Sequence, residues 1–155
     1  TGQNNFPKYI NDPVVGSKTW RTRTSSGTKY IEMSSFGNPL ENNRTLFIVP
    51  VDLTTANNLS FKTRTNFYNG ETLKVYYSTN YVPGSAISSA TLVNITSNFT
   101  FSTANTSTAS FTNSGVYSIP ISVTGNGFFI FEYTGSGLTS PTLTTNMQID
   151  DIVVN

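Results

Sequence analysis

The sequence contains no cysteine and no histidine, and only 11% of its 155 residues are charged, against about 25% in an average soluble domain. These absences exclude disulfides, the usual kind of zinc site and Ser-His-Asp or Cys-His catalysis. A net charge of +1 gives no strong field for nucleic acid, which we exclude as a partner. The sequence contains no run of about 20 apolar residues, so insertion into a membrane is not expected. A role in binding or structure therefore remains the broad expectation.

What the chain has in abundance is uncharged polar residues. Ser, Thr and Asn make up about two fifths of the sequence, and strands favour Thr whereas turns favour Asn. Aromatic residues reach 13%, far from the composition of disordered proteins. The length suits one domain. We therefore predict a single folded β-domain over residues 1–155.

Alternation of apolar and polar residues dominates the chain, as in half-buried strands. Leu59 and Phe61 alternate with Ser60 and Lys62. Asn69-Gly70, a strong hairpin signal, precedes a second alternating run. The stretch 58–78 is therefore predicted to form a β-hairpin.

Further strands are expected elsewhere, but none before Thr19. They are Thr19–Thr24, Lys29–Ser34, Thr45–Pro50, Ala90–Thr96, Ala109–Phe111, Gly115–Val123, Gly127–Thr134 and Asn146–Val154. Many short strands with turn residues every 8–12 positions are typical of a sandwich or barrel. Phe128–Phe131 is apolar on both faces, which predicts a central strand with a loop covering its outer face.

Several segments, in order, carry a resemblance to a known family. They are "GSKTW" from Gly16, "KYIEMSSF" from Lys29, "LFIVPVDLT" from Leu46, "NLSFKT" from Asn58, "LKVYYSTNY" from Leu73, "SGVYSIPI" from Ser114, "FFIFEYTGSG" from Phe128 and "MQIDDIVV" from Met147. From about Gly16 onward the chain resembles the choice-of-anchor and cleaved-adhesin type jelly-roll domains of bacterial surface and secreted proteins. The resemblance implies an all-β, jelly-roll-like β-sandwich of antiparallel strands. It also implies an extracellular or cell-surface location, as a secreted protein or outer-membrane lipoprotein, within a larger multidomain chain.

The double aspartate near the end, Asp150-Asp151, interrupts an otherwise β-prone run. In a regular strand the two side chains face opposite sides. The resemblance implies that one of them contributes to a structural calcium site, and closeness of chain ends suggests Asp12 as a partner. The alternative is that Asp150 bonds backbone amides while Asp151 meets solvent or an arginine.

Aromatic residues are the candidates for ligand binding. Alternation places Tyr77 on the core face and Tyr76 on the other, while Tyr68 and Tyr81 fall in flanking loops. Exposed Tyr68, Tyr76 and Tyr81, with Asn80 as a hydrogen-bonding neighbour, would suit a sugar surface. Asn80 is equally interpreted as a turn former. Trp20 is expected in the core.

Charged residues suggest two further interpretations. Glu132, on an apolar strand, is either half of a hydrolytic carboxylate pair or a buried partner of an arginine. The basic residues are interpreted as a solvated sheet face or edge, and they are Lys18, Arg21, Arg23 and Lys29. The expected function is a non-catalytic module that binds carbohydrate or a cell-surface ligand. The alternatives are a structural spacer without a ligand and a glycoside hydrolase.

Overall fold

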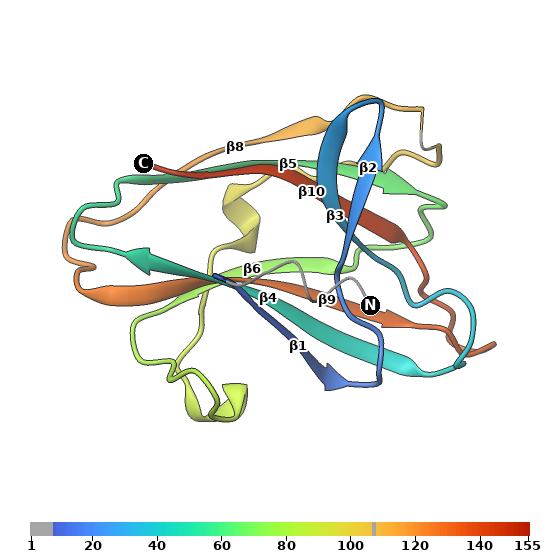
Figure 1. Ribbon diagram of the computed structural model, residues 1–155, viewed down its shortest axis with the longest axis horizontal. Helices are drawn as coiled ribbons and strands as arrows, with labels where there is room; N and C mark the ends of the chain where they lie inside the picture. The colour runs from blue at the N-terminus through green and yellow to red at the C-terminus, as the bar shows by residue number, and fades with distance from the viewer. Residues whose placement is uncertain (1–7, 107) are drawn as a thin grey trace.

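The computed structural model describes residues 8–106 and 108–155, which form two antiparallel five-stranded sheets packed face to face (Figure 1). Sheet A consists, in spatial order, of β1 (Ile10–Val15), β4 (Asn42–Asp52), β9 (Asn126–Ser136), β6 (Leu73–Ser78) and β7 (Val93–Asn94). Sheet B consists of β2 (Arg21–Ser25), β3 (Thr28–Met33), β10 (Asn146–Val154), β5 (Asn58–Asn66) and β8 (Thr112–Ser118). The predicted jelly-roll-like β-sandwich is confirmed.

Short helical turns complete the chain, namely η2 (Ile87–Ser89) and η3 (Thr96–Asn98). Within the described residues, neither these turns nor any other helix has the length and apolar character needed to cross a bilayer.

The main core lies between the sheets and follows from the alternation in the sequence. On β5, Leu59 and Phe61 point inward and are at most 2% exposed. Phe61 meets Phe131 of the opposite sheet edge to face, with ring centroids 5.1 Å apart. Trp20 is fully buried, as predicted, and its indole N–H donates to the carbonyl of Thr45. Large aromatic side chains thus bridge the two layers and supply much of the apolar burial.

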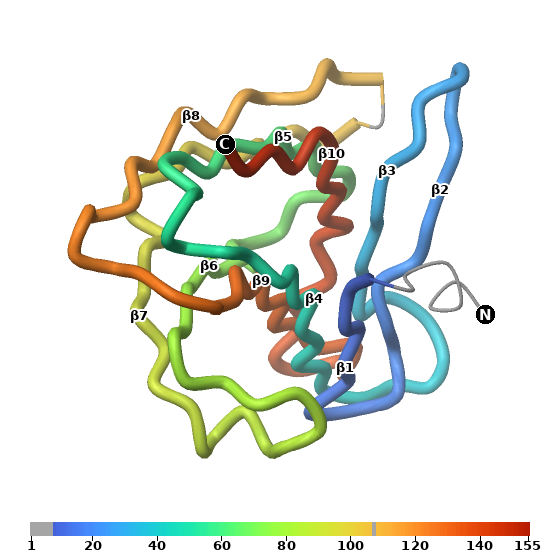
Figure 2. Tube along the Cα trace, turned by 60° about the vertical axis from the view of Figure 1, so that its left-hand side comes forward, coloured from blue at the N-terminus to red at the C-terminus, as the bar shows by residue number. Residues whose placement is uncertain are grey.

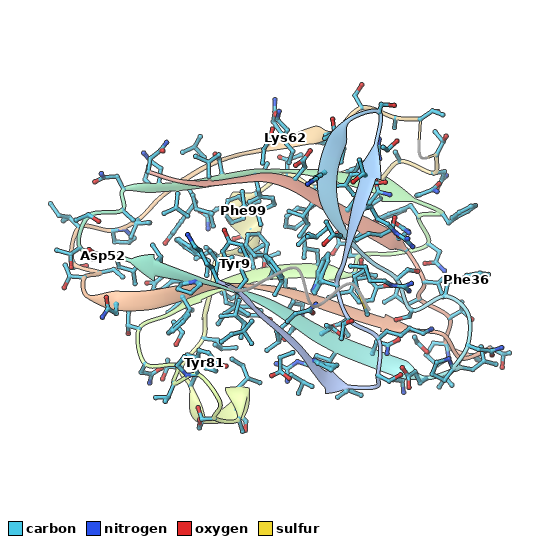
Figure 3. The ribbon with its side chains drawn as sticks, in the orientation of Figure 1. Tyr9, Phe36, Asp52, Lys62, Tyr81 and Phe99 are labelled. Atoms are coloured by element: carbon cyan, nitrogen blue, oxygen red, sulfur yellow. The ribbon has the colours of Figure 1, made fainter. Side chains whose placement is uncertain are left out.

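Sheet A has a second apolar cluster on its outer face. Leu46, Ile48 and Ile130 point away from sheet B and are covered by Tyr81 and Ile87 from the segment 79–92. This segment loops beneath sheet A in Figure 1, and Figure 3 labels Tyr81 there, whereas Phe99 lies between the sheets. The prediction that β9 is a central strand with a covering loop is confirmed.

Three strand predictions are wrong, and the first is Ala109–Phe111, which lies outside any strand because β8 begins at Thr112. The stretch 58–78 is not a hairpin, because β5 pairs with β10 and β8 in sheet B while β6 pairs with β9 and β7 in sheet A. The turn at Asn69-Gly70 instead carries the chain between layers and is bonded to Thr145. A strand also precedes Thr19, since β1 pairs with β4 at the edge of sheet A. Its proline, Pro13, is tolerated because edge strands have no second neighbour to bond.

The β2–β3 hairpin stands apart from the rest of sheet B, as Figure 2 shows. β3 pairs with β10 only from Met147 to Ile149. Beyond that point β10 has a β-bulge, and Asp151 adopts a positive φ of 48°. A bulge inserts one extra residue and so shifts the inward-facing alternation.

Candidate functional site

A cleft of about 460 Å³ opens on the outer face of sheet B, at the end where β3 and β5 finish and β10 begins. We call it the B-face cleft. It is lined by Arg21, Glu32, Ser34, Phe36, Phe67, Asn69, Thr144 and Asn146. Phe36 and Phe67 are 78% and 74% exposed, whereas phenylalanine is normally buried. Two exposed aromatic rings beside polar groups are a surface suited to the apolar faces and hydroxyls of sugars.

Lys18 holds the loop that carries Phe36. Its Nζ atom donates hydrogen bonds to the carbonyl oxygens of Ser35, Phe36 and Gly37, at 2.6, 3.0 and 2.7 Å. Hard metal cations are bound by backbone carbonyl oxygens in loops, and here the ammonium group of Lys18 occupies such an environment. Burial lowers the pKa of Lys18, and the charge of Glu41 opposes this shift. Lys18 is only 9% exposed, so its assignment to a solvated sheet face is wrong.

A core residue anchors the same loop from below. The hydroxyl of Tyr133 accepts a hydrogen bond from the amide of Ser35 at 3.1 Å and donates to the carbonyl of Thr145 at 2.9 Å. The hydroxyl of Ser34 accepts from the amide of Phe36 and donates to the carbonyl of Thr144. The loop that presents Phe36 is therefore tied to the strand β9 and to the start of β10.

The opposite wall of the cleft is held in a strained conformation. Phe67 has a φ of 52°, in the left-handed region that a bulky side chain rarely adopts and that clusters at functional sites. Its amide donates to the carbonyl of Asn105. Asn69 then fixes the turn, because its Oδ1 accepts the amides of Thr144 and Thr145 at 2.9 and 3.0 Å. Both rings thus project from loops whose backbones are held by several bonds.

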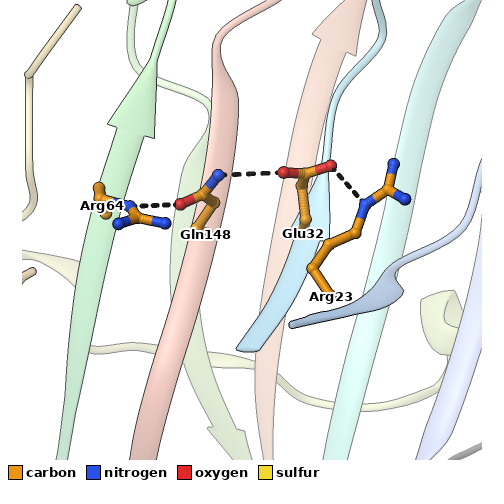
Figure 4. A network of polar contacts seen from close by, with 4 residues as sticks. All are labelled: Arg23, Glu32, Arg64 and Gln148. Atoms are coloured by element: carbon orange, nitrogen blue, oxygen red, sulfur yellow. Dashed lines mark hydrogen bonds and ion pairs between the residues drawn. The ribbon is translucent and has the colours of Figure 1, made fainter. Parts of the chain in front are cut away.

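A line of polar side chains crosses sheet B from the cleft, as Figure 4 shows. The Nε atom of Arg23 pairs with one oxygen of Glu32 at 3.0 Å, and the amide of Gln148 donates to the other oxygen at 3.0 Å. The Nε atom of Arg64 donates to Gln148 at 2.6 Å. The guanidinium of Arg64 also lies 5.2 Å from the ring centre of Tyr30 and 4.5 Å from that of Phe111. This face is a fixed polar and aromatic surface.

One buried polar atom of the cleft has no partner among the described residues. The Oδ1 atom of Asn146 is buried and accepts no hydrogen bond from the described residues. A buried acceptor without a donor costs about 1–3 kcal/mol, so such groups in native proteins call for an explanation. Asn146 lines the cleft, but this oxygen has less than 1 Å² of accessible surface, so a ligand reaches it only if the side-chain amide rotates.

The predicted binding residues do not come together at this cleft. Tyr81 is 6% exposed and packs edge to face on Phe128 at 5.1 Å, so the expected exposure is wrong. Tyr76 is half-buried, and its hydroxyl donates to Glu132. Asn80 bonds Ser78 and Thr91 as a turn former. Tyr68, half-buried next to Phe67, does not line the cleft.

The three predicted metal ligands are also separated. Asp12 lies opposite Leu46 in β1, so it faces outward from sheet A and not toward sheet B. Asp150 and Asp151 do not face opposite sides, because the bulge places both between the inward-facing Ile149 and Ile152. The carboxylate of Asp151 already pairs with Lys62 at 2.8 Å.

These three aspartates do not fit one calcium site, and the described part of the chain holds no other group of three or more potential metal-ligating Asp, Glu, His or Cys side chains. Nothing in the described part of the chain supports the predicted calcium site, and titration with calcium would test it.

Glu132 is the buried partner of an arginine, as one interpretation expected. It is 5% exposed, and its carboxylate lies 2.7 Å from the guanidinium of Arg44. Tyr76 donates to the other oxygen at 3.3 Å. Burial is the main cause that raises the pKa of Tyr76, and the charge of Glu132 adds to it. Both oxygens of Glu132 are thus bonded within the protein, and the carboxylate is not accessible to act on a glycosidic bond.

Neither Phe36 nor Arg21 was predicted as a site residue from the sequence. The available signal was a large aromatic residue in a Ser-Ser-Phe-Gly loop directly after a strand. That signal is weak, because aromatic residues in other loops of this chain, such as Tyr81, are buried.

Comparison with solved structures supports the fold. The K2 cleaved adhesin domain of Lys-gingipain superposes with a TM-score of 0.62 at 14% identity, over 96% of this chain and 90% of that one. TmCBM61, solved with β-1,4-galactotriose, gives 0.56 at 12% identity, over 99% and 91%. The enzymatically active domain of bacteriophage CBA120 tailspike protein 4 gives 0.58 at 13% identity, over 99% of this chain but 20% of that one.

No family model matches the sequence, and no curated protein matches it significantly.

Proposed function

We propose that this protein is a non-catalytic extracellular module that binds a glycan, free or on a cell surface, in the B-face cleft. The observation that carries the proposal is the pair of exposed rings, Phe36 and Phe67, that line the B-face cleft beside a few polar side chains. Their loops are fixed before any ligand arrives, so little conformational entropy is lost on binding. The fold is shared with a module solved with a galactotriose and with an adhesin domain, which agrees with this role.

The lining of the cleft supports a non-catalytic role for it. Glycoside hydrolysis requires two carboxyl groups about 5–10 Å apart. Glu32 is the one carboxylate among the described lining residues. Both of its oxygens are already bonded, one to Arg23 and one to Gln148. We therefore assign Glu32 to organising the sheet face.

A bacterial surface or secreted location within a larger chain accompanies this proposal. The charge-poor surface rich in Ser, Thr and Asn suits contact with water and sugar hydroxyls.

A glycan panel that includes β-1,4-galactotriose tests the proposal, with wild type compared with Phe36→Ala and Phe67→Ala. Each ring contributes about 1–2 kcal/mol of stacking and apolar contact, so each variant should bind about 5–30-fold more weakly. Melting temperatures should stay unchanged because both rings are exposed. Ile121→Ala, at a 99% exposed position outside the cleft, is the matched control.

If no glycan of the panel binds at millimolar glycan concentration, the alternative that the protein is a structural spacer would be favoured. Binding that survives both phenylalanine substitutions would place the ligand elsewhere on the molecule.

A further inference from the structure

Arg21 is the one charged group of the B-face cleft that no described residue neutralises. It is the first residue of β2 and lies directly opposite Glu32 of β3 in the register. Such cross-strand pairs of opposite charge normally interact. Here Glu32 instead bonds the diagonal neighbour Arg23 with one oxygen and Gln148 with the other. The guanidinium of Arg21 is left exposed on the wall of the cleft.

The charged neighbours of Arg21 offset one another, Lys18 with Glu41 and Arg23 with Glu32, and so leave the charge of Arg21 uncompensated. Lys18 lies close enough for Arg21 to contribute to the lowering of its pKa, after the larger effect of burial. The ammonium of Lys18 is enclosed by carbonyl oxygens, and Glu41 is bound to Ser17 and Asn43 rather than to Arg21. The cleft therefore has a surplus positive charge beside its two aromatic rings.

We propose that the glycan bound in this cleft is anionic, and that its carboxylate or sulfate group pairs with Arg21. This rests on the proposed function and names its ligand class. The planar guanidinium presents parallel N–H donors that match a carboxylate or sulfate, and such charge-assisted pairs are about twice as strong as neutral ones. Phe36 and Phe67 contact the apolar ring faces.

The experiment measures binding of the full chain by calorimetry to matched pairs of oligosaccharides. One pair is an oligogalacturonate and its carboxyl-reduced form. The other pair is a heparin-derived sulfated oligosaccharide and its desulfated form. The two pairs distinguish carboxylate from sulfate as the anionic group. Wild type should bind at least one anionic member about tenfold or more tightly than its neutral counterpart.

Variants separate a specific pair from general charge attraction. Arg21→Gln should remove the preference by weakening anionic binding about tenfold, with neutral binding changed less than about twofold. Arg21→Lys should recover part of the loss, since the charge remains but the planar fork does not. Lys29→Gln changes the net charge equally, at an exposed position of β3 outside the cleft, and should leave the preference intact.

Two failures are distinguishable. Equal binding of anionic and neutral sugars, weakened by Phe36→Ala but not by Arg21→Gln, would overturn this inference and leave the proposed function standing. Anionic binding that Lys29→Gln reduces as much as Arg21→Gln, and that the phenylalanine substitutions do not change, would overturn both.

Discussion

Replacing Lys18 by methionine should destabilise the fold and loosen the cleft. The change removes three hydrogen bonds, to the carbonyls of Ser35, Phe36 and Gly37. Bonds to a charged donor contribute about 1.5–3 kcal/mol each, but the sum overstates the cost. Water can reach the partly buried carbonyls of Phe36 and Gly37, whereas Ser35 is fully enclosed. Relief of the burial of a charge offsets part of the loss, so the expected net cost is about 2 kcal/mol.

Thermal and denaturant unfolding measure this cost. For a chain of this size, about 2 kcal/mol corresponds to a fall in Tm of about 4–8 °C. Lys74→Met, at an exposed lysine without a hydrogen bond or ion pair to a described residue, should change Tm by less than about 1 °C. If Lys18→Met had the Tm of wild type, the ammonium group would not stabilise this loop as a bound metal cation would.

The remaining predictions concern pH and calcium. A hydrogen bond from the Ser17 amide, followed by one from Asn43, holds the pKa of Glu41 below its ordinary value of 4.5. The ionised Glu41 therefore stabilises the fold above pH 4.5, and this stabilisation is lost as the pH falls through the lower pKa of the folded state. Below pH 4.5, the Tm of Glu41→Gln should fall less steeply with pH than the Tm of wild type or of the control variant Glu71→Gln. Calcium added to chelator-treated protein should give no heat and no rise in Tm, because Asp151 is paired with Lys62. Binding of one calcium ion per chain, measured as heat and abolished by Asp150→Asn, would restore the calcium hypothesis.

Most of the fold was predictable because alternation reports which face of a strand is buried. The strand that contains Leu59 and Phe61, and the two-faced apolar run at Phe128–Phe131, both have the predicted orientation. The edge strand β1 was not predictable from alternation, since Pro13 reads as a breaker. Asn69-Gly70 has the chemistry of a hairpin turn, but tertiary bonds to Thr145 use it to cross between layers.

The candidate site was less predictable, because it is assembled from loops far apart in the sequence. Phe36 and Phe67 follow different strands, and their neighbour Asn146 begins a third. The cluster of tyrosines near Tyr76 and Tyr81 was a stronger local signal. It fills the apolar cover of sheet A instead. Local composition cannot separate an aromatic residue that covers a sheet from one that faces solvent.

The position of the ligand is tested most directly by an NMR titration of backbone amides with the tightest-binding glycan. We predict that the largest changes in chemical shift fall on the two loops of the B-face cleft, at Phe36 and Phe67, and on Asn69 and Asn146. Changes centred on the segment 79–92, on the opposite face of the sandwich, would contradict it.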